Sequence, residues 1–449
     1  MSPAEHPFLD AVLARPADDG PRLVYADFLA EGDDPADAAR ADLIRVQLAL
    51  ARLPDDHPRR QALAERESDL LNRHQAEWTA HLRGLVVGVE FRRGLPDSVA
   101  VDAAVFAARG AELFARTRSP AGNSYLRRVR LHEPARVLPR LLDCAALGFV
   151  EELSLAGGEL GNGGVYHLVR SPHLRRLRAL DLSFNGLDDA GVRFLAGSAA
   201  LPRLERLALN DNGHITWDGV TALAASPYLA GLTDLDLGGN DVNDAGVRAL
   251  AASTTLGRLS GLKLAGNHVG DGGVAALVGS PLFRRLLARD GRIDLRANAV
   301  GPAGAEALAA SADLARATAL DLDKNYLGDR GAAALAVSPA AARLKRLRLS
   351  RNQITDAGAF ALSDALTRGL PGLRTIDVSG NRLTWRGANA VRDAAVARGV
   401  IPDVSGNAGE APGSGPHPVP DGLADPAPAG AGNVDELRRR VTFPSRRER

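Results

Sequence analysis

One pattern of apolar and polar positions recurs along most of the chain. From about residue 150 the phrase Leu-x-x-Leu-x-Leu-x-x-Asn keeps returning, first clearly at Leu177–Asn185, and its asparagines recur every 27 to 31 residues up to Asn381. The last two leucines of each phrase alternate with polar residues, which predicts a short strand with one buried face. A degenerate copy around Leu153 precedes the series, and a truncated copy at Val404–Asn407 follows it.

The second half of each repeat predicts a helix. After the asparagine come an apolar residue, a short Asp/Gly stretch, a glycine and an Ala/Leu-rich run such as Gly246–Ser253. Ser-Pro pairs such as Ser280–Pro281 are expected to end several of these helices, because proline disfavours a helical residue before it. Carboxylates near the helix starts are expected to cap the free N–H groups there; they are Asp189, Asp244, Asp271, Asp329 and Asp356.

A unit of strand, turn and helix cannot bury its leucines alone. Stacked units would lay their strands into a parallel sheet and join the leucines into one continuous core. Helices are wider than the roughly 4.8 Å spacing of strands, so the stack must curve with the sheet on its inner side. The pattern therefore predicts an α/β horseshoe solenoid with the parallel sheet on the concave face and the helices on the convex face.

The repeated phrase resembles the ribonuclease-inhibitor-type leucine-rich repeat proteins. The resemblance covers roughly Leu126 to Asn407 and rests on the near-complete copies that end at Asn185 through Asn381. It implies a cytosolic horseshoe that binds other proteins on its concave face or rim. It does not identify the partner, because recognition in this family lies in the variable positions.

The first 82 residues have no repeat and are expected to be mostly helical. Amphipathic helices are predicted around Phe8–Leu13, at Arg22–Glu31, Ala38–Leu53 and Arg59–His81. The phrases Arg22–Glu31 and Arg40–Gln47 resemble a bacterial repeat-companion domain, which is usually found ahead of leucine-rich repeats and has no assigned activity. Phe28 stands where that domain commonly has Trp. The resemblance implies a bacterial origin and adds nothing about chemistry.

Four regions are expected from these patterns. Residues 1–82 form the helical repeat-companion domain, 83–131 cap the open end of the solenoid, 132–407 hold the leucine-rich repeats, and 408–449 form a disordered Pro/Gly-rich linker and basic tail. Within the cap, strands are expected at Leu85–Phe91 and Leu95–Val101, followed by a helix at Ala103–Phe114. For the basic tail, a solvated end and a contact with an anionic surface both stay open.

Composition narrows the possible function classes. Lys+Arg 55 against Asp+Glu 54 gives a net charge of +1, and aromatic residues make up only 4% of the chain. A net charge this small does not attract nucleic acid, and so few aromatic residues do not suggest a surface on which bases stack. No nucleic-acid partner is therefore expected. No apolar run reaches the roughly 20 residues of a membrane span, and the N-terminus lacks a signal-peptide layout. We expect a cytoplasmic protein of unknown oligomeric state.

No catalytic constellation is found, so no enzymatic activity, cofactor or metal is expected. The one cysteine, Cys144, excludes a disulfide framework and lies in an apolar run, where a buried inert thiol is expected. His268 lies near Asp271, but both fall in the turn that every repeat shows. A local cluster in the first domain could be catalytic or could simply form acidic turns and helix caps; it consists of Asp18, Asp19, Tyr25 and Asp27.

The concave face offers the candidate site. Residues that alternate with the strand leucines should point out of the sheet. In register, Asp321 should lie beside Arg348, Arg348 beside Asp377, and Arg296 beside Asp323, whereas Asp294 and Asp321 should be adjacent like charges. The candidate protein-binding residues are Asp181, Arg206, Asp234, Asp236, Lys263, Arg292, Asp294, Arg296, Asp321, Asp323, Arg346, Arg348 and Asp377, and Glu152 shares their column.

Two interpretations of these charges stay open. They could be cross-strand ion ladders that only hold the sheet together. Alternatively, they form a mixed-charge protein-binding face with an acidic emphasis, suited to a partner that bears Arg or Lys; here Asp234 and Asp236 are expected to be flanked only by Arg206 and Lys263. The expected function is a non-enzymatic interaction scaffold. The alternative is a regulator of an enzyme, such as a leucine-rich repeat protein of the GTPase-activating type.

Overall fold

The structure divides into two compact units, which are described separately. The computed structural model describes residues 6–53, 57–119 and 124–407. The first unit ends at Trp78 and the second begins at Thr79. The predicted linker and basic tail, residues 408–449, lie outside the described residues.

The first unit is helical, as its apolar periodicity predicts. Its core is built between helices α2 and α3, where Tyr25, Leu29 and Leu43 are buried. The side chain of Asp34 accepts a hydrogen bond from the N–H of Ala36 at 2.8 Å and so caps α3. The helices are α1 (His6–Ala14), α2 (Gly20–Ala30), α3 (Pro35–Arg52) and α4 (Arg59–Trp78).

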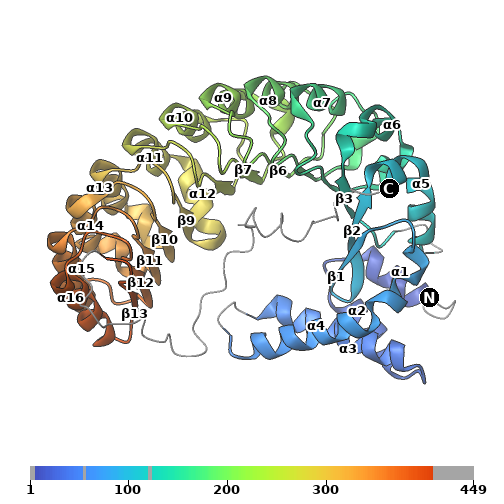
Figure 1. Cartoon of the computed structure of the whole chain (residues 1–449), viewed down its shortest axis with the longest axis horizontal. Coiled ribbons are helices and arrows are strands. Elements are labelled where there is room, and N and C mark those ends of the chain that lie inside the picture. Colours follow the sequence, from blue (N-terminus) through green and yellow to red (C-terminus); the bar gives the residue numbers. More distant parts are fainter. Residues whose placement is uncertain (1–5, 54–56, 120–123, 408–449) are drawn as a thin grey trace, which may run out of the picture. The chain divides into compact units, whose positions relative to one another are not determined.

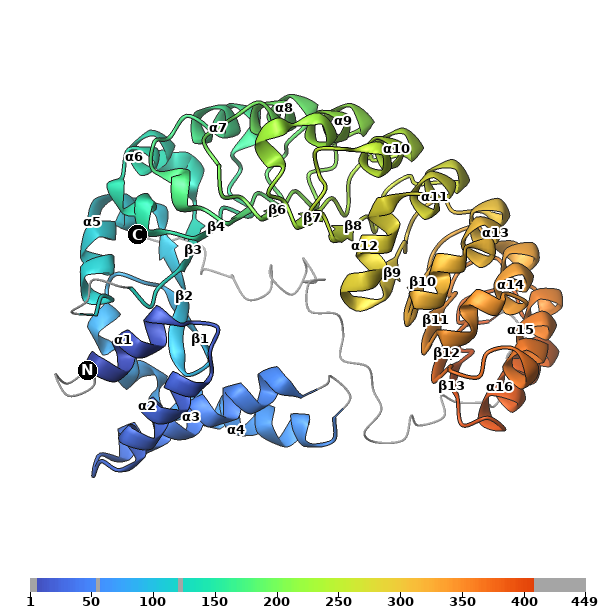
Figure 2. The ribbon, with the colours of Figure 1, turned by 180° about the vertical axis from the view of Figure 1, so that it is seen from behind.

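The second unit is an arc of stacked repeats. Both ribbon views place the strands on the inner, concave side and the helices on the outer, convex side (Figures 1 and 2). The parallel strands are β4 (Glu152–Ser154), β5 (Ala179–Asp181), β6 (Arg206–Ala208), β7 (Asp234–Asp236), β8 (Gly261–Lys263), β9 (Arg292–Asp294), β10 (Ala319–Asp321), β11 (Arg346–Arg348), β12 (Thr375–Asp377) and β13 (Ile401–Asp403). The convex helices are α7 (Gly161–Leu168), α8 (Asp189–Ala196), α9 (Trp217–Ala225), α10 (Asp244–Ala252), α11 (Asp271–Val278), α13 (Pro302–Ala310), α14 (Gly328–Ala336), α15 (Asp356–Arg368) and α16 (Trp385–Val396). The predicted strand–turn–helix unit and the parallel sheet are confirmed.

An antiparallel strand lies at the N-terminal edge of the sheet. Strand β1 (Gly88–Arg92) pairs antiparallel with β2 (Leu95–Asp102), and β2 pairs parallel with β3 (Arg128–His132). Helix α5 (Ala103–Arg116) follows β2 and buries aromatic residues, and the short helix α6 (Leu138–Leu142) follows β3. The predicted strand–helix order of residues 85–131 is therefore present, with boundaries shifted by a few residues.

The repeats are joined by their asparagines as well as by their leucines. The Nδ2 group of Asn325 donates to the carbonyl of Leu322 in its own repeat and to the carbonyl of Leu295 in the preceding one, at 3.0 and 2.9 Å. Its Oδ1 atom accepts from the N–H of Val300 at 2.9 Å. Asn325 is 2% exposed, so each buried amide satisfies backbone groups of two repeats.

The predicted role of the helix-start carboxylates is only partly correct. Asp188, not Asp189, caps α8, because its side chain accepts from the N–H of Ala190. The Asp189 carboxylate instead accepts hydrogen bonds from the N–H groups of Thr216 and Gly219, at 2.8 and 3.0 Å, in the next repeat. This carboxylate therefore links two neighbouring repeats through backbone hydrogen bonds. The same link is made by Asp244, Asp271, Asp329 and Asp356.

The sheet is interrupted between β8 and β9. One sheet runs from β1 to β8 and a second from β9 to β13. The interruption coincides with the 31-residue repeat, which contains an additional helix, α12 (Pro281–Asp290). The Ser-Pro prediction was incomplete here: α11 ends at Val278 with Gly279 as its C-cap, and Ser280 caps the start of α12 by accepting from the N–H of Phe283 at 3.1 Å. A crevice of about 60 Å³ lies beside the break.

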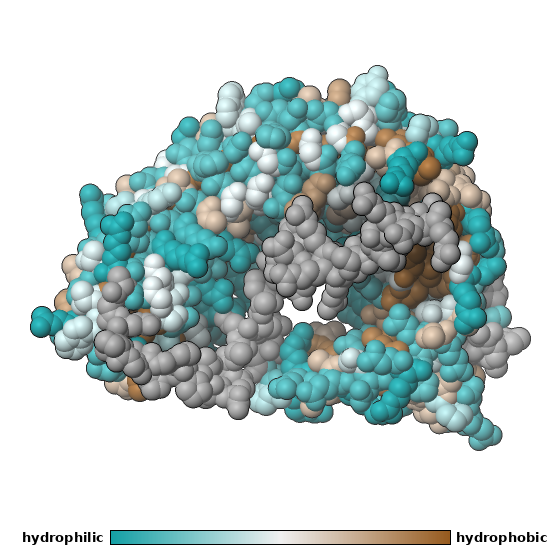
Figure 3. Space-filling view, viewed as in Figure 1, coloured by the Kyte–Doolittle hydropathy of each residue, from teal (hydrophilic) through white to brown (hydrophobic). Residues whose placement is uncertain are grey.

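One face of the second unit is mostly polar. Figure 3 shows a largely hydrophilic surface over the outer arc in this view, with a hydrophobic area on the inner side at the right. Among the described residues, no helix has the length and apolar character needed to cross a membrane.

Candidate protein-binding face

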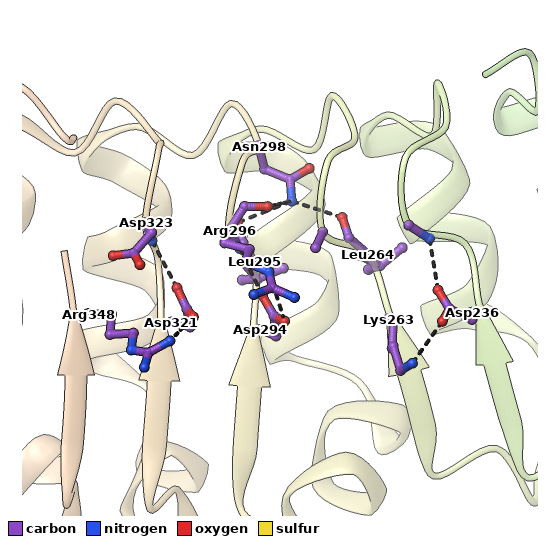
Figure 4. Close-up of polar contacts among 12 residues, drawn as sticks. Asp236, Lys263, Leu264, Asp294, Leu295, Arg296, Asn298, Asp321, Asp323 and Arg348 are labelled. Atoms are coloured by element: carbon purple, nitrogen blue, oxygen red, sulfur yellow. Dashed lines mark hydrogen bonds and ion pairs between the residues drawn. The ribbon is translucent and has the colours of Figure 1, made fainter. Parts of the chain in front are cut away.

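The charged strand positions lie on the concave face with partial exposure. In β5, β7, β10, β11 and β12 the central residue is buried and its two neighbours are half-buried, as alternation requires. Figure 4 shows Asp236, Lys263, Asp294, Asp321 and Arg348 side by side on consecutive strands. The strand leucines face the opposite way, into the core, so these polar groups line the concave surface.

The N-terminal half of the face is an ion ladder. Arg128 pairs with Asp97 at 2.8 Å and with Glu152 at 3.2 Å. Arg206 reaches Glu152 at 2.6 Å across the intervening strand β5, where the facing residue is the small Ala179. Every charge in this ladder has a partner of opposite sign, which agrees with the structural interpretation for this part of the sheet.

The middle of the face is more fully paired than the sequence predicts. Lys263 pairs with Asp236 at 2.8 Å, as expected from the register. Asp234, however, pairs with Arg289 of α12 at 2.6 Å, so the prediction that only Arg206 and Lys263 flank these aspartates is wrong. Gly261 makes room for this contact, because a Cβ atom there would meet the guanidinium of Arg289 and lie 2.5 Å from the Asp234 carboxylate.

In the C-terminal half, several carboxylates lie close to one another. The register places Asp321 between Asp294 and Arg348, and Arg348 between Asp321 and Asp377, as predicted. Arg348 approaches Asp321 at 3.6 Å. Arg296 lies beside Asp323 in register, as predicted, because the N–H of Ala297 donates to the carbonyl of Asp323 at 2.7 Å. Its guanidinium, however, pairs with Asp294 of its own repeat at 3.4 Å. We call Asp294, Asp321, Asp323, Asp377 and Asp403 the acidic patch; β13 contributes Asp403, which lies beside Asp377 in register.

Within the acidic patch the negative charges oppose one another. Burial raises the pKa of Asp323 to about 6, and repulsion from Asp321 and Asp377 adds to this shift, whereas the hydrogen bond from Ser350 opposes it. Burial likewise raises the pKa of Asp294, with repulsion from Asp321, and the pKa of Asp377, with repulsion from Asp403. Neither Asp323 nor Asp377 forms an ion pair with any residue that the structure describes.

The predicted site residues therefore fall into separate groups. Asp181 and Arg206 belong to the N-terminal half, where Asp181 accepts a hydrogen bond from Ser154. Asp234, Asp236 and Lys263 form the middle group. The C-terminal half holds Arg292, Asp294, Arg296, Asp321, Asp323, Arg346, Arg348 and Asp377.

The sequence analysis missed two participants in this face. Arg289 lies on a helix that the repeat pattern did not predict, and the only signal for it was the extra length of that repeat. Asp403 precedes the truncated last copy, and the register of β13 with β12 brings it beside Asp377.

The other candidate groups do not assemble into a catalytic centre among the described residues. In the first unit, Asp19 pairs with Arg52 at 2.8 Å and Asp27 with Arg45 at 2.6 Å, and Tyr25 is buried. His268 Nδ1 lies 3.1 Å from Asp241, not beside Asp271. The described residues contain no cluster of three or more His, Cys, Asp or Glu side chains suited to a metal ion.

Cys144 is half-buried rather than buried, which corrects the prediction for this thiol. Its thiol donates to the carbonyl of Phe106, with 3.7 Å between sulfur and oxygen.

Comparison with known proteins identifies the repeats. Segments 173–196, 232–251, 259–278, 318–336 and 343–363 match the family model described as Leucine Rich repeat. A solved structure of an internalin from Listeria monocytogenes is similar at a TM-score of 0.36 and 15% sequence identity, over 76% of this chain and 95% of that one. No curated protein matches the chain by sequence. The repeats that build the concave sheet are therefore leucine-rich repeats.

Proposed function

We propose that this chain is a non-enzymatic scaffold that binds a protein partner on the concave face of its leucine-rich repeats. The proposal includes a cytoplasmic horseshoe of the ribonuclease-inhibitor type, in which residues 83–131 cap the solenoid and residues 1–82 form a repeat-companion domain. It is supported by the matched repeats and by the half-exposed, charged strand positions. Surfaces of this kind are extended and concave, which suits contact with a folded partner.

The acidic patch is the part of the face that we assign to the partner. In the N-terminal half and in the middle, most charges already pair with a charge of opposite sign, and Asp181 accepts hydrogen bonds from Ser154 and Ser183. A partner would have to break these existing contacts. In the acidic patch, Asp323 and Asp377 have no ion-pair partner among the described residues, and their pKa values are raised because ionisation is unfavourable there. This imbalance is the observation that carries the proposal.

The partner that fits this patch presents arginine or lysine side chains. A guanidinium beside Asp323 or Asp377 would offset the burial and the repulsion that raise the pKa values of these carboxyl groups, and it would donate two N–H groups to one carboxylate. The patch spans strands β9 to β13, about 20 Å at the usual strand spacing of ~4.8 Å. A short basic segment on the surface of a folded protein would fill it.

An affinity experiment with matched variants tests the assignment. The full chain, the D323N/D377N variant and the D364N/D393N variant would each be used to capture proteins from native lysate, with identification by mass spectrometry. Asp364 and Asp393 are exposed residues on α15 and α16, so the control changes the same charge on the outer side of the same repeats.

We expect a protein that is captured by the wild type and by the control but lost from D323N/D377N. A purified sample of that protein should then bind the D323N/D377N variant at least about 10-fold more weakly, as expected when hydrogen-bonded charge pairs at an interface are truncated. If every captured protein binds all three chains equally, the acidic patch is not the site. The concave charges would then serve only to hold the sheet together.

A further inference from the structure

The two rims of the repeat arc carry different sets of charged residues. In each repeat one loop joins the end of the convex helix to the next strand, and we call the line of these loops the helix-to-strand rim. The opposite, strand-to-helix rim carries the carboxylates that link neighbouring repeats, such as Asp189 and Asp329, together with exposed arginines such as Arg351 and Arg382.

Four consecutive loops of the helix-to-strand rim present exposed cations and one exposed aromatic ring. Arg175 and Arg176 precede β5, Arg203 precedes β6 and Arg258 precedes β8. In the loop before β7, between those of Arg203 and Arg258, Tyr228 is 48% exposed. We call these five residues the rim strip.

The cations of the rim strip are not used to hold the fold. Arg175, Arg176, Arg203 and Arg258 are exposed, and none of them pairs with a carboxylate of a described residue. Nearby carboxylates are already engaged, since Glu151 pairs with Arg127 and Glu205 with Arg178, both at 3.6 Å.

Tyr228 is likewise held by its backbone and not by its ring. Its N–H donates to the side chain of Ser226 at 3.3 Å, which caps the short turn Pro227–Leu229. The ring has no aromatic or cationic neighbour among the described residues. Because the turn already fixes the backbone of Tyr228, a ligand that stacks on the exposed ring would cost little additional conformational entropy.

We propose that the rim strip binds a single-stranded nucleic acid through its phosphate backbone, with one base stacked on Tyr228. Arginine forks match phosphate oxygens. The four loops lead into strands about 4.8 Å apart, so their arginines and Tyr228 lie along one line that an extended strand could follow. Cations interleaved with an exposed aromatic ring are the combination used for sequence-tolerant binding of single strands. A membrane surface would need an apolar anchor beside these cations, and the five residues of the rim strip include none. The expectation of no nucleic-acid partner considered the summed charge and the overall share of aromatic residues, and not how either is distributed along one rim.

Fluorescence anisotropy with labelled 12-nucleotide oligo(dT) and a mixed-sequence RNA tests this proposal on the full chain. At low salt we expect binding whose affinity falls with salt at a log–log slope of about −2 to −3, because about three or four phosphates are contacted. The R175Q/R176Q variant should bind about 10-fold more weakly. Its log–log salt slope should be less negative by about 1.4, because two phosphate contacts are lost at about 0.7 each. The Y228A variant should lose about 5- to 100-fold with its slope unchanged.

A matched control lies on the other rim. Arg351 and Arg382 are exposed residues of the strand-to-helix loops, so R351Q/R382Q removes the same charge without touching the rim strip. We expect this control to bind like the wild type. The proposal is overturned if the wild type does not bind, if both charge variants weaken binding equally, or if Y228A has no effect. Equal dependence on the rim strip for poly-glutamate or for phosphatidylserine vesicles would also overturn it, in favour of an acidic protein or a membrane surface.

Discussion

Asp323 illustrates how the fold brings together carboxylates that repel one another. It follows β10, and its Oδ1 atom accepts a hydrogen bond from the N–H of Ser350 at 2.8 Å in the neighbouring repeat. That bond favours the ionised carboxylate, but burial and the adjacent carboxylates of Asp321 and Asp377 disfavour it more strongly. An ionised carboxylate in such surroundings reduces the stability of the unbound protein. A bound cation would stabilise that carboxylate.

The raised pKa of Asp323 predicts a definite pH dependence. The carboxyl group titrates near 3.8 in the unfolded chain and at about 6 in the folded one, so between these values the folded chain holds a proton that the unfolded chain has released. The contribution of Asp323 to stability is therefore highest below pH 4 and falls as the pH rises through 6. We expect D323N to be more stable than the wild type at pH 7, by about 1 kcal/mol because solvent screens a half-buried group.

Urea unfolding of both chains at pH 4, 5 and 7 measures this difference. The gap between variant and wild type should nearly vanish at pH 4, where the wild-type carboxyl group is neutral. D364N, on the exposed side of α15, should show no such trend. A gap that is constant with pH would show that the amide acts through packing or hydrogen bonding and not through charge.

At the residue scale the sequence could predict much of this site. Period-two alternation and the regular repeat length were enough to place Asp321 beside Arg348 and Arg348 beside Asp377. They were not enough to assign Arg296, because a long side chain can fold back onto its own strand as easily as across to the next. The raised pKa values of Asp294, Asp323 and Asp377 could not be predicted from the sequence, because they depend on how deeply each carboxyl group is buried.

At the scale of elements, helix α12 is the feature that the repeat pattern did not contain. It replaces the short loop of the other repeats, and its Arg289 crosses above β8 to reach Asp234 on β7. This route passes over Gly261 of β8, where a Cβ atom would stand in the way. The pairing of Asp234 therefore depends jointly on an inserted helix and on the absence of a side chain.

This dependence predicts that Gly261 and Arg289 are energetically coupled. The G261A substitution should displace the guanidinium of Arg289 and break its pair with Asp234, so R289A should have little further effect in that background. We expect each single change to shift the unfolding free energy by no more than about 1 kcal/mol, as is usual for a partly exposed ion pair. The coupling energy should be about 0.5 to 1 kcal/mol.

A double-mutant cycle measured by urea unfolding gives this coupling energy. Arg285 serves as the control, because it lies on the same helix but donates to the carbonyl of Leu259. Additive effects of G261A and R289A, within about 0.3 kcal/mol, would mean that the two positions act independently. Gly261 would then matter only for the backbone of β8.

At the scale of the whole repeat unit, stability is expected to depend on contacts between neighbouring repeats. We call the contact between two neighbouring repeats a seam. Most seams combine strand pairing, hydrogen bonds from the repeat asparagine to the preceding repeat, and helix packing, whereas the seam between β8 and β9 lacks the strand pairing. It retains the backbone bond from Gly266 to Arg296, at 3.0 Å, and the bridge from Asn298 to Leu264, at 2.9 Å. In a linear array the seam with fewest contacts is where cooperativity fails first.

We therefore expect the unit to open first between β8 and β9. Each missing ladder bond removes about 0.5 to 1.5 kcal/mol, so the amides of residues 259–264 and 292–295 should exchange with an opening free energy lower by about 1 to 2 kcal/mol than those of β10 and β11. Hydrogen–deuterium exchange with mass spectrometry in sub-denaturing urea resolves both seams in one sample. The intact ladder between β10 and β11 is the internal control. Equal opening free energies at the two seams would mean that the packing of α12 against β8 and β9 replaces the lost ladder, and the repeats would then unfold as one cooperative block.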